Sequence, residues 1–267
     1  MQLHIANYEP NRMGGGWSFQ NNLAKGFEHT EDSDIYFITS PSIVQRAEVV
    51  QAKSQGKKIV LRLDNVIRNS RNRNTGMSRM KDFCELADLV IYQSEWAKKF
   101  LMPFTKTDGP VILNGVDTSI FTPSDKPEGT YLYVRSSRDE GKQWIMAWYW
   151  MVNRPGKLEI VGKFSPENLE YNFDFYNGED YTFSGQQTDM PSVYRRNKYF
   201  LYTYLNDAMS NTAIEALCSG CEIIDVNGMA KTGGMPEIMA KWETSGRDYF
   251  STDRMCQEYG KAMEILL

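Results

Sequence analysis

The segment LNDAMSNTAIEALCSGCEII, residues 205–224, carries more structural information than any other part of the chain. The apolar run before it predicts a buried strand, and the acidic residue Asp207 follows directly. Ser210 or Asn211 then caps a helix whose apolar residues recur at helical spacing. A second apolar run at the end of the segment predicts another strand. Strand, helix and strand in this order form the unit of a parallel α/β sheet, which binds ligands at the carboxyl ends of its strands.

The same alternation runs through most of the chain. Short, continuously apolar runs predict strands that are buried on both faces of a parallel sheet. We expect these strands at residues 3–6, 34–39, 58–63, 89–93, 111–113, 131–134, 158–161, 181–183, 199–204 and 222–226. Segments with helical periodicity separate them. We expect helices at residues 18–27, 77–87, 140–152, 211–219 and 236–241, and from a cap at 251–253 to the last residue.

One segment interrupts this pattern and predicts a domain boundary. Residues 121–130, FTPSDKPEGT, combine two prolines, a glycine and small polar residues. The 267 residues suffice for two modest domains. We therefore predict an α/β protein with two Rossmann-like, doubly wound domains, residues 1–123 and 124–267, that face a cleft.

Composition excludes several classes of protein. The chain is 41% hydrophobic and 24% charged, as is typical of a globular protein, and its net charge of −4 argues against a nucleic-acid partner. We expect no transmembrane segment and no signal peptide, because the apolar runs are too short for either. Four cysteines do not make a disulfide framework in a chain of this length, so we expect a cytoplasmic location.

A glycine run near the N-terminus is the first candidate ligand site. Glycines at 14–16 let backbone amides approach a phosphate or a sugar, and the helix that follows adds partial positive charge. A nicotinamide-dinucleotide site is excluded, because Phe19 occupies the position of its third glycine and Asp34 opens the second strand instead of closing it. A plain tight turn remains the alternative interpretation.

Two basic segments also allow two interpretations each. Residues 66–81 hold five basic side chains and no acid, which fits a solvated loop or a lip of the cleft that attracts an anionic substrate or membrane headgroups. Residues 135–142, RSSRDEGK, follow a strand. Their two arginines and lysine could bind a diphosphate, or they could form a solvated turn.

The segment 205–224 supplies the strongest candidate site. Backbone amides at the start of its helix could hold an anion or sugar hydroxyls. Glu215, one turn into that helix, can accept hydrogen bonds from the paired hydroxyls of a ribose, and we expect it to be ionised at neutral pH. Cys218 and Cys221 have the spacing of a redox pair, but they close a helix where such a pair would precede one, so we assign them to packing.

These motifs, in this order, resemble a known family. The segments are GGG (14–16), RLDN (62–65), ADLVIYQSEWAKKFL (87–101), ILNGVDTSIFTP (112–123), EIVGKF (159–164), residues 206–224 and GGMPEI (233–238). Together they resemble the GT-B-fold glycosyltransferases of the family 4 type, which retain anomeric configuration and use nucleotide sugars. The family carries two glutamates separated by seven residues. Here Asp207 and Glu215 keep that spacing with a shortened first acid.

The resemblance implies a role for each matching residue. Arg138 and Lys142 correspond to the basic pair that binds the donor diphosphate, with Arg135 as a competing candidate. Glu215 corresponds to the acid that holds the ribose, and Asp207, with the amides of Met209, Ser210 and Asn211, to the donor-sugar site. Gly15 and Gly16 correspond to the loop that approaches the diphosphate from across the cleft, and Asp64 to a polar residue near the reacting centre. Asn114 and Asp117 are expected only to fix a turn.

The implied function is transfer of a sugar from a nucleotide-diphosphate sugar to an acceptor hydroxyl on a glycan, glycolipid or protein glycan, with retention. No essential metal is expected, because the single D-x-D, at Asp32 and Asp34, lies in a charged turn before a strand. The first domain is shorter than in relatives, so either the acceptor site is unusually open or a partner or a second copy completes it. Two alternatives remain. A catalytically silent sugar-binding module would not hydrolyse the donor, and an epimerase-like isomerase would rearrange the sugar without transferring it.

Overall fold

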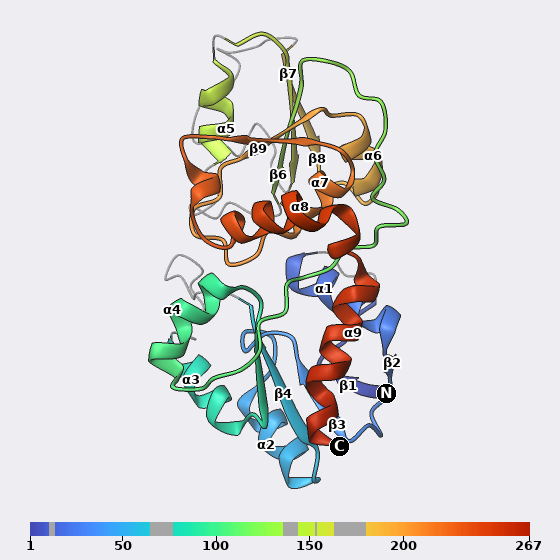
Figure 1. Cartoon of the computed structure of the whole chain (residues 1–267), viewed down its shortest axis with the longest axis vertical. Coiled ribbons are helices and arrows are strands. Elements are labelled where there is room, and N and C mark those ends of the chain that lie inside the picture. The colour runs from blue at the N-terminus through green and yellow to red at the C-terminus, as the bar shows by residue number, and fades with distance from the viewer. Residues whose placement is uncertain (11–13, 65–76, 136–143, 153, 163–179) are drawn as a thin grey trace.

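Two parallel β-sheets, one in each half of the chain, form the framework of the protein (Figure 1). The structure is a computed structural model and describes residues 1–10, 14–64, 77–135, 144–152, 154–162 and 180–267. Within these residues the element order alternates strand and helix in both halves, which confirms the predicted α/β architecture. No helix in the described ranges combines the length and the apolar composition that crossing a bilayer requires.

The first sheet has the strand order β2-β1-β3-β4-β5, and neighbouring strands are parallel. Its strands are β1 (Gln2–Ile5), β2 (Glu28–His29), β3 (Ile35–Ile38), β4 (Lys58–Leu63) and β5 (Leu89–Tyr92). Every residue of β3 and β5 is buried, as their continuously apolar sequences predict. The two-residue strand β2 was not predicted. The strand expected at 111–113 is wrong, because Val111 makes only a single bridge to Tyr92.

The second sheet repeats the arrangement with the order β10-β9-β6-β7-β8. Its strands are β6 (Thr130–Arg135), β7 (Lys157–Gly162), β8 (Tyr181–Gly185), β9 (Tyr199–Tyr202) and β10 (Glu222–Asp225). All pairings between them are parallel. The carboxyl ends of β6 and β9, where the sequence places the candidate site, are therefore neighbours in one sheet edge.

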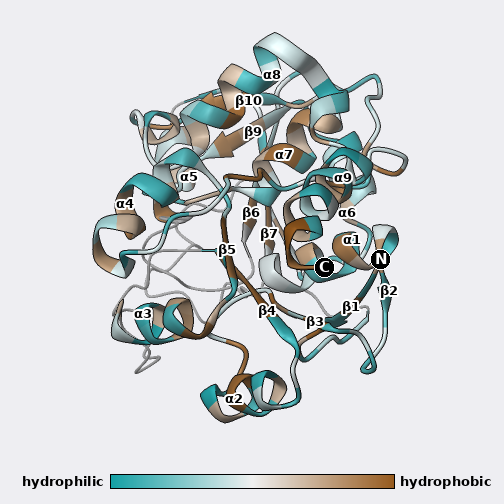
Figure 2. Ribbon diagram, turned by 60° about the horizontal axis from the view of Figure 1, so that its bottom comes forward, coloured by the Kyte–Doolittle hydropathy of each residue, from teal (hydrophilic) through white to brown (hydrophobic). Residues whose placement is uncertain are grey.

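Helices cover both sheets. They are α1 (Gly15–Gly26), α2 (Arg46–Ser54), α3 (Met77–Leu86), α4 (Glu95–Thr105), α5 (Trp144–Met151), α6 (Met190–Arg195), α7 (Asn211–Cys218), α8 (Met235–Tyr249) and α9 (Thr252–Met263), with short 3-10 turns η5 (Met229–Lys231) and η6 (Glu264–Leu266). Figure 2 shows hydrophobic residues along β5, whereas α2, α3 and α4 each carry a hydrophilic face. This is the pattern of helices that bury one side against a sheet.

Helices α2, α4 and α6 were not predicted, although each has a cap at its start. The side chains of Ser94 and Asp189 accept hydrogen bonds from backbone amides in the first turns of α4 and α6, and Gln45 and Glu48 form a capping box on α2. Helices α2 and α6 have 9 and 6 residues, so their apolar periodicity is brief. Helix α4 has 11 residues, but it contains Pro103, a residue that normally ends a helix.

The last helix, α9, returns to the first half of the chain and packs beside α1 (Figure 1). Met255, Cys256, Tyr259 and Met263 are buried in one cluster with core residues of β1, β3 and α1. The chain crosses back at Ser251, which pairs with Val116. The boundary between residues 123 and 124 stays a prediction, but the core of the first half includes residues from the C-terminal end.

Candidate functional site

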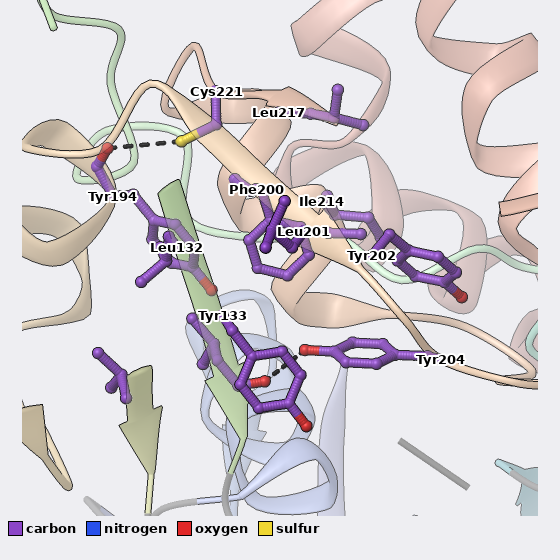
Figure 3. Packing of buried hydrophobic residues seen from close by; sticks show 14 of the residues in the cluster. Leu132, Tyr133, Tyr194, Phe200, Leu201, Tyr202, Tyr204, Ile214, Leu217 and Cys221 are labelled. Atoms are coloured by element: carbon purple, nitrogen blue, oxygen red, sulfur yellow. Dashed lines mark hydrogen bonds between the residues drawn. The ribbon is translucent and has the colours of Figure 1, made fainter. Parts of the chain in front are cut away.

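The segment after β9 is held in place by the buried side chain of Tyr204 (Figure 3). Its hydroxyl donates a hydrogen bond to the Val134 carbonyl at the end of β6 and accepts one from Thr212 Oγ1 on α7 at 3.3 Å. Two neighbouring strand ends and the helix that follows are thereby fixed to one another. The predicted ligand site at this sheet edge thus has a rigid base.

Helix α7 begins where the sequence predicts. Ser210 is its N-cap and accepts a hydrogen bond at Oγ from the amide of Ala213 at 3.3 Å, and Asn211 is the first helical residue. Met209 and Ser210 are both buried, at 6% and 3% exposure. The amides in the first turn of a helix have no partner within the helix, and the helix dipole gives this end partial positive charge. This end of α7 is therefore suited to an anion or to sugar hydroxyls.

Asp207 lies half-buried in the loop that leads to α7, and two glycines support this loop. The amide of Gly234 donates to the Asp207 carbonyl at 2.8 Å. A Cβ atom at Gly233 or Gly234 would collide with the backbone of Asp207 or Ala208, and Gly233 also has a φ of +64°. The GGMPEI motif thus acts by close backbone packing against the Asp207 loop. Two adjacent glycines before a helix were the sequence signal for this contact.

Glu215 lies one turn into α7, and its protonation differs from the expectation. Its Oε2 accepts a hydrogen bond from the buried hydroxyl of Tyr194 at 2.9 Å. Burial raises the pKa of Glu215 to about 7, although the Tyr194 hydrogen bond acts in the opposite direction. The expectation of a carboxylate that is fully ionised at neutral pH is therefore wrong. The favourable effect of the helix N-terminus fades beyond the first turn, and desolvation outweighs it at this position.

Gly15 and Gly16 form the first turn of α1 and border open space. Gly14 precedes them with a φ of +130°, a conformation that glycine adopts readily. A Cβ atom built at Gly15 or Gly16 would meet no other heavy atom within 4 Å. The Gly15 carbonyl accepts a hydrogen bond from Nδ2 of Asn211 at 3.3 Å. The structure therefore brings together the starts of α1 and α7, which belong to opposite halves of the chain.

Asn114 does more than fix a turn, the role expected for it. It is 2% exposed, and its Nδ2 donates to Oδ1 of Asn211 at 2.7 Å. No local feature of the sequence indicates this contact, because the two residues are 97 positions apart. Asp117 does fix a turn, since its Oδ1 accepts a hydrogen bond from the Ser119 amide at 2.9 Å.

The remaining predicted site residues are Asp64 and Arg135, which the structure describes, and Arg138 and Lys142, which it does not. Asp64 is half-buried and directly follows β4 at the carboxyl edge of the first sheet. Its carbonyl accepts a hydrogen bond from the Gln93 side chain. Arg135 ends β6. Arg138 and Lys142 lie outside the described residues, so their role in binding the diphosphate stays a prediction.

The D-x-D sequence lies away from this site. Asp34 immediately precedes β3, and its carbonyl accepts a hydrogen bond from the amide of Lys58 at the start of β4. It therefore lies at the amino edge of the first sheet, opposite the carboxyl ends that bear the candidate site. Across the described ranges, no group of three histidine, cysteine, aspartate or glutamate side chains is arranged to hold a metal ion.

No protein-family model matches the sequence, and no curated protein does. Solved structures do resemble it. Anabaena Alr3699/HepE in complex with UDP-glucose superimposes with a TM-score of 0.72 at 11% identity, covering 99% of both chains. Sucrose-phosphate synthase from Thermosynechococcus elongatus gives 0.66 at 16%, over 98% of this chain and 82% of that one. A TarM variant from S. aureus, in a complex that contains UDP, gives 0.61 at 12%, over 91% and 58%. The chain has the GT-B fold, as predicted.

Proposed function

We propose that this protein is a glycosyltransferase that moves a sugar from a nucleoside-diphosphate sugar to an acceptor hydroxyl. The observation that carries the proposal is the meeting of two helix N-termini, one from each half, at the contact between Gly15 and Asn211. Each end presents unpaired amides and partial positive charge, and open space borders Gly15 and Gly16. A diphosphate placed there would be approached from both sides.

The parts of the donor can be assigned along this site. We assign the ribose to Glu215 and the sugar to Asp207 and the amides of Met209, Ser210 and Asn211. The GT-B proteins of similar structure favour uridine as the base, because HepE was solved with UDP-glucose and with UDP. Assignment of the diphosphate to Arg138 and Lys142 rests on the sequence alone.

The chemistry follows from this placement. The bond between the anomeric carbon and the diphosphate oxygen breaks, the acceptor oxygen bonds to that carbon, and the acceptor proton is released. Negative charge develops on the departing diphosphate and positive charge on the sugar. Helix amides fixed in advance stabilise the negative charge on the diphosphate, and we propose that they do so, together with Arg138 and Lys142, without an essential metal. The carboxylates of Asp207 in the second half and Asp64 in the first half are suited to stabilise the positive charge on the sugar.

Further features of the reaction come from the family resemblance. We propose that a hexose is transferred with retention, as in the family 4 type, and that a partner or second copy completes the acceptor site. A reducing cytoplasm suits the chain, because Cys84, Cys218, Cys221 and Cys256 are all buried and unpaired with one another.

A thermal-shift panel tests the donor class. UDP, GDP and ADP, each with and without an attached glucose, are added to the protein, since a ligand that binds only the native state raises its melting temperature. We expect UDP and UDP-glucose to give the largest shifts and to keep them in excess EDTA. A panel without any shift would contradict a nucleotide-sugar site, and a shift that requires added magnesium or manganese would contradict metal independence.

A further inference from the structure

Arg62, on β4, is a buried cation with neutral hydrogen-bond partners. It is 2% exposed, and its NH2 group donates to Oε1 of Gln93 at 2.6 Å and to Oδ1 of Asn114 at 3.0 Å. Its NH1 group donates to the Thr39 carbonyl at 3.2 Å. None of the ion pairs in the described part of the chain includes Arg62. A buried charge without a counter-ion is costly, so its surroundings must compensate it. The dipoles of these partners do so together with the face of the Phe19 ring, whose centroid lies 4.0 Å from the guanidinium carbon.

The hydrogen bonds of Arg62 fix the orientation of two asparagines. A guanidinium group only donates, so the carbonyl oxygen of Asn114 must face Arg62 and its NH2 group must face away. That NH2 group donates to Oδ1 of Asn211 at 2.7 Å, which turns the NH2 group of Asn211 toward the Gly15 carbonyl, 3.3 Å away. All three bonds point in one direction, from the buried cation to the start of α1. Bonds aligned in this way polarise one another.

We propose that Arg62, Asn114 and Asn211 form a directional hydrogen-bond relay that joins the two halves and orients the starts of α1 and α7 toward one anionic ligand. Arg62 and Asn114 are positioning residues, since the relay holds Asn211 against Gly15 at the start of α1. The identity of the ligand as a nucleoside diphosphate rests on the proposed function. The relay itself is a property of the unliganded protein.

The substitution Asn114→Asp separates this role from simple structural support. A carboxylate of the same size can accept the Arg62 hydrogen bond and gives the buried cation a counter-ion, so the folded state should not lose stability. The carboxylate has no hydrogen with which to donate to Asn211, so the relay is cut at its middle bond. Loss of ligand affinity without loss of stability is the signature of positioning.

Gln93→Glu is the matched control. Gln93 is also 2% exposed and also accepts a hydrogen bond from Arg62, so this variant likewise places a carboxylate beside the guanidinium. It leaves the bond between Asn114 and Asn211 intact. Both variants therefore add the same charge to the same buried cation, and each removes one amide donor: that of Gln93 to the Asp64 carbonyl, or that of Asn114 to Asn211. Only Asn114→Asp interrupts the relay.

The experiment measures three quantities for the wild type and both variants. Melting temperature reports stability, calorimetric titration with UDP reports affinity, and hydrogen–deuterium exchange without ligand reports the backbone at residues 14–19 and 209–214. For Asn114→Asp we expect an unchanged or higher melting temperature, at least tenfold weaker UDP binding, and faster exchange in both segments. For Gln93→Glu we expect UDP affinity within twofold of the wild type and unchanged exchange.

The outcomes distinguish the relay from the proposed function. Wild-type exchange rates in Asn114→Asp would overturn the relay, whatever happens to UDP binding. Faster exchange with unchanged UDP affinity would overturn its role in positioning the ligand, and so would an equal loss of affinity in Gln93→Glu. If the wild type itself does not bind UDP while Asn114→Asp exchanges faster, the proposed function fails and the joining of the two halves stands.

Discussion

The Glu215 carboxyl group is poised between its two protonation states at neutral pH. Burial raises its pKa to about 7, and its proposed partners, two ribose hydroxyls, donate hydrogen bonds that favour the charged form. Nucleotide binding should therefore lower the pKa of Glu215 and release a proton. We expect UDP affinity to fall as the pH drops below 7, because the acid must then ionise before it can bind.

Calorimetry measures this proton release directly. At pH 7 the binding enthalpy of UDP-glucose, whose phosphates do not titrate near this pH, should vary with the ionisation enthalpy of the buffer. The slope should correspond to release of part of one proton. Glu215→Gln should abolish the slope. The pH profile of stability has the opposite sign: an acid whose pKa is raised in the folded state favours folding below the unfolded value of 4.5, and that contribution is lost as the pH rises toward 7. Proton uptake on binding would contradict the ribose assignment.

The two acids of the segment 205–224 should differ in kinetics. Ribose hydroxyls are alike in the ground state and the transition state, so Glu215→Gln should mainly raise the KM for the donor. Asp207 is assigned to the sugar, whose charge changes during the reaction. Asp207→Asn should therefore lower kcat at saturating donor more than it weakens UDP binding. If Asp207→Asn abolished UDP binding and Glu215→Gln preserved it, the donor would be placed backwards along the site.

At the scale of elements, the start of α1 allows a test of whether the open space beside Gly16 binds the donor. A side chain at Gly16 has no heavy atom within 4 Å of its Cβ, so Gly16→Ala should not destabilise the fold and should gain about 0.5–1 kcal/mol from helix propensity. The larger side chain of Gly16→Leu would extend into the same open space. We expect UDP-glucose affinity to fall from glycine to alanine to leucine while the melting temperature does not. A parallel fall in both quantities would mean that this space belongs to the core.

Local sequence patterns predicted most strands and the start of α7, but they could not predict contacts between distant residues in the site. Strands such as β5, residues 89–92, are continuously apolar and bounded by polar residues, so local pattern located them. The N-cap at Ser210 was equally local. The partner of Glu215, Tyr194, and the link from Arg62 through Asn114 are contacts between distant positions, set by how the sheets pack. Desolvation of Glu215 depends on the same packing, which is why its pKa was misjudged.

At the scale of the whole molecule, α9 links the two halves, because this C-terminal helix is part of the core of the first half. Tyr259 is fully buried against the rings of Phe19 and Phe37, with centroids 5.6 and 5.7 Å away. The sequence located this helix and its cap but not its destination, because an amphipathic helix can bury its apolar face against either sheet. Its return joins the C-terminal end of the chain to the first half, and Glu237 on α8 adds a second connection by accepting a hydrogen bond from the Glu95 amide at 2.8 Å.

We propose above all that the two halves together break the bond between the sugar and the diphosphate of a nucleotide sugar. The most direct measurement is the release of free nucleoside diphosphate from UDP-, GDP- and ADP-glucose without acceptor and in excess EDTA, for the wild type and Asp207→Asn. We predict slow release from UDP-glucose above the rate in buffer, and a clear reduction of that rate by Asp207→Asn at saturating donor. Absence of release from every donor, or release that Asp207→Asn leaves unchanged, would contradict the claim.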